Sequence, residues 1–521
     1  MKVVKTLGLV LFLVGFGIFN ATFFTADYQL TESILKDQLG ENDKVQLFNE
    51  NSDLTNKTIT SNFQFVSSLD ETFRKVNEIQ LSKYAISDEE IDALIAANTD
   101  NFSLQTLSIL GDSDLAEYKR KTFNDYGNWL DGRSFNSKEE MKALVSQVVD
   151  NIKKYQIVNE KGFDQYKVKD LKYALTKASA VGPVASDPAL FLVLTYVLCI
   201  VGAFLYIIPK INDGPPGIKN NGIFHSAMKN TGWLGILTGA FLIAFYIVLY
   251  FYPEYMTNWI IMVDPLSQFL KGSDAGRFFL YGFIYTLCIL VMGVRMLIKY
   301  RHSKYQMVRT FSVMFFQTAF AFLIPEILLR LNQPYFDFKN IWPLDYDFFF
   351  DNELDTLLAS GGLGLFMLGW GIALIIIGVP VFVYFFGKRW YCSWVCGCGG
   401  LAETLGDPYR QLSDKSLGAW KVERWMIHSV LVFAVVMTGG VLYTYWTGNS
   451  QVFGFSTYDV RSVYGAWIGA GFAGVVGTGF YPLMGNRVWC RFGCPLAAYL
   501  GIIQRFKSRF RITTNGGQCI S

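Results

Sequence analysis

The feature that most constrains this chain is a series of long apolar stretches with few charged residues. A helix that crosses a lipid bilayer needs roughly 20 consecutive, mostly apolar residues. Eight stretches meet this requirement: 6–25, 189–208, 232–252, 278–298, 310–330, 362–386, 425–446 and 464–484. The chain is 51% hydrophobic, which is too apolar for one soluble domain. The sequence therefore predicts an all-α polytopic membrane protein with about eight transmembrane helices.

The charges that flank these stretches predict how the chain is oriented. Lys and Arg are enriched in short loops on the cytoplasmic side of a bilayer. The link 299–309 and the tail after Gly485 are basic and contain no acidic residue, whereas the loop 331–361 carries six acidic residues and one lysine. We therefore expect a multi-pass protein of the bacterial inner membrane. Residues 28–188 are expected to be extracytoplasmic and the C-terminus cytoplasmic.

Four of the eight cysteines belong to a motif that occurs twice. Residues 387–396 read GKRWYCSWVC, and residues 485–494 read GNRVWCRFGC, at an offset of 98 positions. The glycine, the arginine and both cysteines are identical in the two copies, and each copy follows a glycine-containing apolar stretch. This pattern indicates a duplicated unit that consists of one span and one pair of thiols.

The spacing within each motif is suited to binding a metal or a cluster. Cysteines at positions i and i+4 lie on one face of a helix, and two such pairs supply four thiolates. Four thiolates are the usual complement of an iron–sulfur cluster or of a structural zinc ion. Nearby Arg389, Arg487 and Arg491 are expected to lower the pKa of the thiols. The candidate ligands are Cys392, Cys396, Cys490 and Cys494. The alternative is that these cysteines are small residues that pack helix ends.

Two of the four cysteines outside the repeat lie in the same C-terminal region. Leu496 stands where the second copy would need a match for Cys398, so Cys398 is interpreted either as a spare ligand or as a packing residue. Cys519 lies in a polar segment near the end of the sequence and cannot form a cluster site alone. It would be a suitable entry into a C-x2-C-x2-C-x3-C run, which wraps a [4Fe–4S] cluster. We therefore include Cys519 as the first ligand of such a module.

The paired motifs, with Pro495 directly after the second, resemble the membrane polyferredoxins of the NapH/NosR type. The resemblance covers about residues 362–521. It implies an inner-membrane protein that carries [4Fe–4S] clusters and exchanges electrons with redox proteins of a respiratory or maturation system. The ferredoxin run that the resemblance implies does not follow Cys519, and residues 28–188 lack the flavin-attachment motif of the nitrous oxide branch.

These observations divide the chain into four parts. Residues 1–27 are expected to be an N-terminal transmembrane anchor or a signal peptide, and residues 28–188 a mainly helical extracytoplasmic domain. Residues 189–386 contain the predicted transmembrane helices 2–6. Residues 387–521 contain both cysteine motifs, transmembrane helices 7–8 and the start of a truncated ferredoxin-like tail.

Few polar groups lie inside the predicted spans. Glu326 and Arg330 are four residues apart and are expected to pair at a helix end, rather than to bind a proton or a quinol. Arg295 is interpreted as a positive-inside anchor. His428 lies near the depth of the cysteine pairs, but no second intramembrane histidine offers another axial ligand, so haem is not expected. A quinone is the second cofactor candidate.

The chain is predicted to be an electron-transfer component rather than a stand-alone enzyme. It would pass electrons from a cytoplasmic or quinone donor to an extracytoplasmic or respiratory-complex acceptor. The competing hypothesis is a non-redox membrane sensor or assembly scaffold whose cysteines bind structural zinc or only pack. The sequence contains no phosphate loop, no catalytic triad and no nucleic-acid footprint, because membrane topology accounts for its basic segments.

Overall fold

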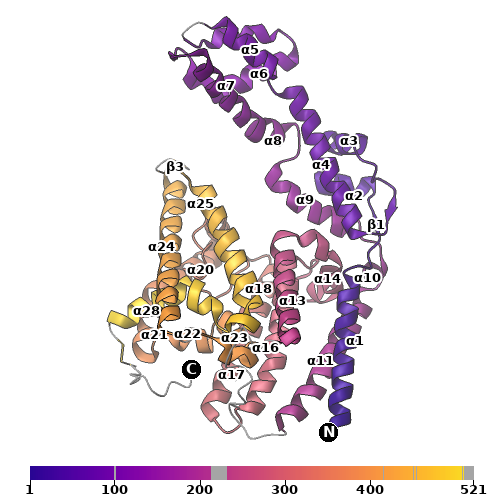
Figure 1. Ribbon diagram of the computed structural model, residues 1–521, viewed down its shortest axis with the longest axis vertical. Helices are drawn as coiled ribbons and strands as arrows, with labels where there is room; N and C mark the ends of the chain where they lie inside the picture. Colours follow the sequence, from indigo (N-terminus) through magenta and orange to yellow (C-terminus); the bar gives the residue numbers. More distant parts are fainter. Residues whose placement is uncertain are drawn as a thin grey trace. The chain divides into compact units, whose positions relative to one another are not determined.

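The computed structural model describes residues 1–98, 101–212, 232–414, 416–449, 451–452, 455–506 and 508–509. In this part of the chain the regular structure is almost entirely helical, and the strands are two-residue segments (Figure 1). The predicted all-α class is confirmed. The chain divides into two compact units, one formed by Thr22–Ser186 and the other by Met1–Ala21 with Asp187–Ser521.

The unit Thr22–Ser186 consists of short helices and one small antiparallel pair of strands. Its α-helices are α2 (Glu32–Leu39), α3 (Asn42–Glu50), α4 (Asn62–Tyr84), α5 (Asp88–Ala97), α6 (Asp114–Gly127), α7 (Lys138–Ile152), α8 (Val158–Glu160), α9 (Gln165–Ala178) and α10 (Pro183–Ser186). Shorter helical turns are η1 (Leu104–Leu110), η2 (Asn128–Leu130) and η3 (Lys153–Ile157). Strand β1 (Tyr28–Gln29) pairs with β2 (Thr58–Ile59).

Serine residues fix the starts of several of these helices. Ser87, Ser113 and Ser137 directly precede α5, α6 and α7, and each hydroxyl accepts a hydrogen bond from a backbone N–H in the first turn. Such a cap satisfies a donor that the helix itself leaves unpaired. The apolar faces then pack into two buried clusters, one that contains Phe73 and one that contains Phe123. This unit therefore has a core of its own.

The second unit contains the long apolar helices. Its first half comprises α1 (Lys2–Thr22), α11 (Pro188–Asn212), α13 (Gly232–Phe251), η4 (Pro253–Met256), α14 (Thr257–Met262), α15 (Asp264–Lys271), α16 (Arg277–Lys299), α17 (Lys304–Phe315), η5 (Phe316–Leu323) and α18 (Ile324–Arg330). Its second half begins with α19 (Asp351–Ala359), α20 (Gly361–Ala373), η6 (Leu374–Gly378), α21 (Val379–Phe386), α22 (Arg389–Trp394), α23 (Gly397–Glu403), η7 (Asp407–Leu412) and α24 (Leu417–Thr447). It continues with β3 (Gln451–Val452), β4 (Phe455–Ser456), α25 (Thr457–Tyr464), η8 (Gly465–Val476), α26 (Gly477–Gly479), α27 (Tyr481–Met484), η9 (Trp489–Gly493) and α28 (Pro495–Phe506).

Within the described residues, six helices are long and apolar enough to cross a membrane. They are Lys2–Thr22, Pro188–Asn212, Arg277–Lys299, Lys304–Arg330, Gly361–Phe386 and Leu417–Thr447. A seventh candidate is the pair Gly235–Phe251 and Pro253–Met262, which is bent by 111°. These helices are compatible with a multi-pass membrane protein, but the predicted number of eight is not confirmed. The stretch 464–484 is helical but is not among the helices that are long and apolar enough to cross a membrane. It contains many glycines, and glycine contributes no apolar side chain.

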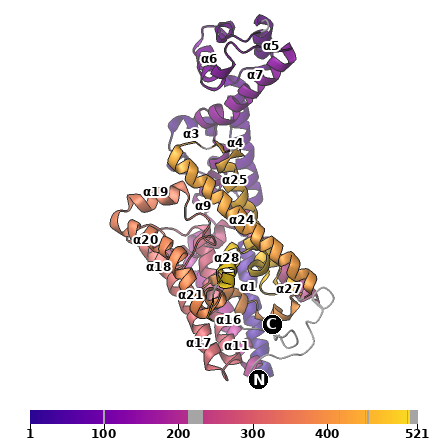
Figure 2. The ribbon, with the colours of Figure 1, turned by 90° about the vertical axis from the view of Figure 1, so that its left-hand side faces the viewer.

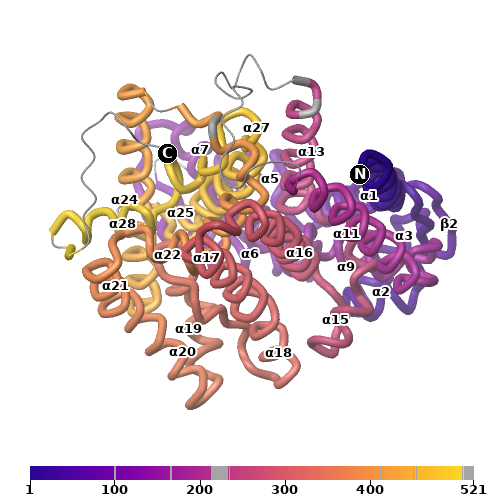
Figure 3. The backbone as a smooth tube through the Cα atoms, turned by 90° about the horizontal axis from the view of Figure 1, so that it is seen from below, coloured from indigo at the N-terminus to yellow at the C-terminus, as the bar shows by residue number. Residues whose placement is uncertain are grey.

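The packing of these helices determines where the cysteine motifs lie. Helices α16 and α17 form a hairpin, and α17 packs against both α22 and α23, which carry the first motif. Helices α24 and α25 lie side by side (Figures 1 and 2). The N-terminal part of α24 approaches α28, and α28 also packs against α21 (Figure 3). The first and second motifs are therefore brought together by helices that are far apart in the sequence.

Candidate metal centre

Each cysteine motif begins with a glycine in the same unusual backbone conformation. Gly387 follows α21 with φ 77° and ψ 171°, and Gly485 follows α27 with φ 91° and ψ 175°. Residues that carry a side chain rarely adopt these angles, so glycine allows the chain to leave the preceding helix at little cost. This conformation explains why the same residue type stands at the start of both copies.

The hydrogen bonds at the second cysteine of each motif are also equivalent. The backbone N–H of Cys396 donates to the carbonyl of Tyr391 at 2.9 Å, and that of Cys494 donates to the carbonyl of Trp489 at 2.9 Å. Each cysteine then directly precedes a helix, α23 in the first copy and α28 in the second. The repeat seen in the sequence is therefore also a repeat of backbone structure.

All four predicted ligands belong to one apolar cluster. Cys396 and Cys494 are both 5% exposed, and Cys392, Cys490 and Cys398 pack against the same cluster while half-buried. Its larger members include Tyr391, Trp489, Leu496 and Leu500. The described cysteines are free thiols. The structure thus brings the two predicted pairs together, whereas Cys519 lies outside the described residues.

The cluster contains two indole N–H groups that have no acceptor. The Nε1 atoms of Trp390 and Trp489 are buried, and neither has a hydrogen-bond partner among the described residues. A buried donor without an acceptor costs free energy, so such groups call for an explanation. Both tryptophans belong to the motifs and lie among the thiols. Sulfur atoms of a bound cluster are acceptors that these donors lack.

The thiols do not form a ready-made site for a single ion. Among the described residues, no three His, Cys, Asp or Glu side chains are placed to hold one metal ion together. Thiolates that share one zinc ion lie within about 4 Å of one another. The thiolates of a four-iron cluster bind separate irons and are therefore spread more widely.

Burial has the largest effect on the pKa of the first cysteine of each motif, Cys392 and Cys490. Burial raises the pKa of Cys490 to about 11, although Arg487 and Arg389 act in the opposite direction. The pKa of Cys392 is also raised, first by burial and then by the neighbouring Cys396 and Cys490. Arg487 and Arg389 lower the pKa of both thiols as expected, but loss of solvation exceeds their effect, so the net pKa shift is upward. Cys490 raises the pKa of Cys392, and Cys396 raises that of Cys490, which shows that the two copies are close.

Cys398 contacts the first pair directly. Its thiol hydrogen-bonds to Cys396, and this bond lowers the pKa of Cys396 to about 6 while burial opposes the shift. A hydrogen bond to the charged form of a group favours that form. Cys398, which the sequence left open as a spare ligand or a packing residue, is therefore in direct contact with a candidate ligand.

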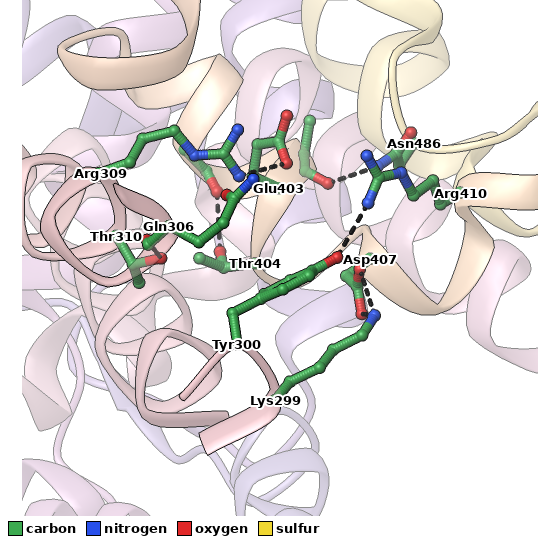
Figure 4. Close-up of polar contacts among 12 residues, drawn as sticks. Lys299, Tyr300, Gln306, Arg309, Thr310, Glu403, Thr404, Asp407, Arg410 and Asn486 are labelled. Carbon is green, nitrogen blue, oxygen red and sulfur yellow. Dashed lines mark hydrogen bonds and ion pairs between the residues drawn. The ribbon is translucent and has the colours of Figure 1, made fainter. Parts of the chain in front are cut away.

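A carboxylate after the first motif joins the two copies. Glu403 is 8% exposed and forms ion pairs with Arg487 of the second motif and with Arg309 of α17, the latter at 3.2 Å. The side-chain amide of Asn486 donates to the carbonyl of Ala402 at 2.7 Å. The start of the second motif is thus attached to the end of α23 (Figure 4).

A second carboxylate attaches this region to α16. Asp407 accepts from Arg295 Nη1 at 2.7 Å and from Lys299 Nζ at 2.7 Å. Burial tends to raise the pKa of Asp407, but the charges of Lys299 and Arg295 outweigh it and hold the pKa below its usual value. Arg410 donates to the hydroxyl of Tyr300 at 3.0 Å in the same region (Figure 4). Arg295 is therefore part of an ion-pair network, and the interpretation as a simple anchor is incomplete.

Sequence reasoning missed Glu403 and Asp407. They are the first acidic residues after Asp355, they are four positions apart, and they directly follow a cysteine motif in a basic part of the chain. Isolated carboxylates among many cations could have indicated ion pairs, since charges are rarely buried without a partner.

The other polar residues within the predicted spans are Glu326, Arg330 and His428. Arg330 donates to the carbonyl of Phe269, and within the described residues no ion pair joins it to Glu326, so the predicted helix-end pair is wrong. Glu326 is buried, and its Oε2 has no hydrogen-bond partner in the described part of the chain. His428 donates from Nδ1 to the carbonyl of Arg424 at 2.7 Å and lines a cavity that also borders Cys392 and Cys490.

A large apolar cavity lies next to the cysteine region. Its volume is about 650 Å³, and its walls come from α1, α11, α13 and α16, with aromatic residues such as Phe16, Phe245 and Tyr246. A small cavity of about 30 Å³ borders Cys398 and Cys490. Tyr281, Tyr285, Leu401 and Thr478 line both cavities. These residues separate the apolar cavity from the thiols.

Comparison with known families agrees with this arrangement of two copies. Residues 369–418 and 465–513 match a family described as a 4Fe–4S binding domain. Each matched segment contains one cysteine pair. The match supports a 4Fe–4S iron–sulfur protein, while the narrower resemblance to the NapH/NosR type stays a prediction. No curated protein matches the chain, and no solved structure does.

Proposed function

We propose that this chain is a membrane-bound electron-transfer protein in which Cys392, Cys396, Cys490 and Cys494 hold one [4Fe–4S] cluster. The observation that carries the proposal is the convergence of both pairs in one buried cluster, in segments that each match a 4Fe–4S binding domain. A bound cluster would supply reversible one-electron transfer.

The surrounding residues fit such a cluster. Tyr391, Trp489 and Leu496 form an apolar shell that excludes water and lowers the local dielectric. Arg389 and Arg487 offset the negative charge of the thiolates, as their effect on the pKa of Cys490 indicates. The indole N–H groups of Trp390 and Trp489 are available as donors to sulfur. Hydrogen bonds and positive charge near the sulfurs favour the reduced state of an iron–sulfur cluster.

A quinone is the proposed membrane-soluble electron donor. The apolar cavity of about 650 Å³ is within the usual size range of ligand sites and is lined mainly by apolar and aromatic side chains. Tyr281 and Tyr285 stand between it and the cavity that borders Cys398 and Cys490, so a ring held there would lie near the thiols. The tyrosine hydroxyls would orient the polar end of the ring.

The proposed location is the bacterial inner membrane, with the cysteine region toward the cytoplasm. This placement is supported by the basic link 299–309 and the basic tail after Gly485. The proposed partners are redox proteins of a respiratory or maturation system, and Cys519 would be the first ligand of a ferredoxin-like module. These partners are inferred from the resemblance and not from a contact in the structure.

Analysis of the purified full-length protein tests the proposal. We expect about four irons and four acid-labile sulfides per chain, and a reduced-state EPR signal after treatment with dithionite. Cys490→Ser removes a proposed ligand and is expected to abolish or severely reduce iron content. Cys199→Ser is the matched control, because Cys199 belongs to α11 and lies outside the cysteine cluster.

The competing hypothesis makes a different prediction for the same samples. A structural zinc site would hold one ion on the four thiolates and would contain no sulfide. If elemental analysis finds one zinc and no sulfide, and dithionite changes no spectrum, the electron-transfer proposal is wrong.

A further inference from the structure

A second cavity, on another side of the cysteine cluster, is strongly basic. It has a volume of about 550 Å³ and lies between α22, α24, η9 and α28. Its lining contains six cationic side chains and one carboxylate, namely Lys388, Arg389, Arg424, Arg487, Arg491, Arg505 and Glu423. Cys392 and Cys490 form part of its wall. This size falls within the range of ligand-binding cavities.

Four of the six cations have no carboxylate partner. Arg487 pairs with Glu403, and Arg491 pairs with Glu423. In the described part of the chain, no ion pair is formed by the remaining four, which are Lys388, Arg389, Arg424 and Arg505. Burial lowers the pKa of Lys388, and the charge of Arg389 lowers it further. So many like charges around one cavity favour an anion inside it.

The cavity also has an apolar floor and an aromatic rim. The floor is formed by small and aliphatic residues, which are Ile427, Ala497, Ala498, Gly501 and Ile502. Trp420, which also lines the cavity, is 52% exposed; Phe386 and Phe506, which are close in sequence to the lining residues Lys388 and Arg505, are 61% and 82% exposed. Exposed aromatic residues next to cations are typical of the boundary between lipid tails and headgroups. If the cavity bound a soluble protein instead of a lipid, these aromatic side chains would stay exposed to water.

We propose that this cavity binds the phosphate of an anionic phospholipid, with the guanidinium groups of Arg389, Arg424 and Arg505 around the headgroup and the start of an acyl chain over the apolar floor. Basic pockets between membrane helices on the cytoplasmic side commonly hold such headgroups. The inference rests on the membrane placement proposed above. It assigns a lipid to a site that borders the proposed cluster ligands.

Gly501 offers a precise test because a Cβ added there would meet no atom within 4 Å. Gly501→Glu would place a carboxylate among the cations, whereas Gly501→Gln adds the same bulk without charge. The purified chain is incubated in mixed micelles of phosphatidylglycerol and phosphatidylcholine with identical acyl chains, and retained lipid is counted by native mass spectrometry. We expect wild type and Gly501→Gln to prefer phosphatidylglycerol by roughly tenfold or more, and Gly501→Glu to lose this preference.

A second pair of variants covers the case in which Gly501 variants do not fold. Arg424→Gln with Arg505→Gln is expected to lower the preference for phosphatidylglycerol roughly tenfold or more. Arg301→Gln with Lys304→Gln is the control, because it removes two exposed cations from the link between α16 and α17, outside the cavity. Equal loss in both double variants would overturn the proposal.

Two further outcomes are decisive. If Gly501→Glu retains phosphatidylglycerol as wild type does, the cavity is not the lipid site. If wild type shows no lipid preference but binds inorganic phosphate in equilibrium dialysis, the site serves a soluble anion and the lipid proposal is wrong. The assay measures lipid and not iron, so its failure leaves the electron-transfer proposal untouched.

Discussion

The two cysteine motifs match in backbone geometry at their first glycine and their second cysteine, but they have different surroundings. Gly387 and Gly485 adopt matching angles, and the second cysteine of each copy makes an equivalent hydrogen bond. In the second copy, Asn486 and Arg487 are bound by the end of α23, through Ala402 and Glu403. Their counterparts in the first copy, Lys388 and Arg389, line the basic cavity and have no such partner among the described residues.

This difference shows how a duplicated unit becomes asymmetric. Duplication supplies a thiol pair and a turn to each half, and both are kept because they depend on local backbone. The residues that follow each pair differ, with Glu403 after the first and Pro495 after the second. One side of the cysteine cluster is therefore closed by ion pairs, and the other is left open to an anion. If the ion pairs hold the closed side together, substitutions there should cost more stability than substitutions elsewhere around the cysteine cluster.

The largest effect is expected at the closed side. Glu403→Gln removes the partner of both Arg309 and Arg487 and leaves two poorly solvated guanidinium groups unpaired. Breaking a buried ion pair in this way costs about 3–5 kcal/mol. We expect a large fall in the thermal midpoint of the detergent-solubilised protein, measured by tryptophan fluorescence.

Two control variants make this prediction specific. Glu423→Gln leaves one arginine, Arg491, without its partner and is expected to cost less. In Glu403→Gln combined with Arg487→Gln, the second change should restore part of the lost stability, because it removes one unpaired charge. If Glu403→Gln and Glu423→Gln were equally mild, the closed side would not be held by these ion pairs.

An intermediate loss of stability is expected when the glycine at the start of either motif is replaced. Gly387→Ala and Gly485→Ala both force a side chain into a conformation that costs about 1–3 kcal/mol. In the second copy the added Cβ would also lie 2.8 Å from the backbone nitrogen of Ser413. We expect both variants to reduce the thermal midpoint and the iron content, and at Gly485 the close approach of Ser413 adds to the cost of the backbone angle.

A helical glycine serves as the reference for these two variants. Gly439→Ala in α24 adds a Cβ that meets no atom within 4 Å, and alanine favours a helix more than glycine does. It is expected to be neutral or slightly stabilising. Equal losses of stability at Gly387, Gly485 and Gly439 would show that the backbone angle does not explain why glycine stands at the start of both copies.

The cysteine repeat could be predicted from the sequence because its determinants are local. The positions of Gly387, Gly485 and the four cysteines follow from backbone turns that each copy makes by itself. The partner of Glu403 could not be predicted in the same way, since Arg487 is brought near only when α23 and the second motif pack together. The net direction of the thiol pKa shifts could not be predicted for a related reason. The sequence shows the nearby arginines, but burial, which dominates, depends on packing.

The smallest effect is expected at Asp407, where the ion pairs join the closed side to α16. The pKa of Asp407 is depressed in the folded protein, because Lys299 and Arg295 outweigh its burial. A carboxyl with a depressed pKa contributes stability above its unfolded pKa of about 3.9, and this contribution is lost as the pH falls through the folded value. The thermal midpoint of the wild type should therefore fall below about pH 4 more steeply than that of Asp407→Asn. Wild type and Asp407→Asn should converge in acid, where the carboxyl of the wild type is protonated as well. Identical pH profiles would mean that Lys299 and Arg295 stabilise the charged carboxylate no better than water does, and that the packing of α16 against this region does not depend on the ion pairs.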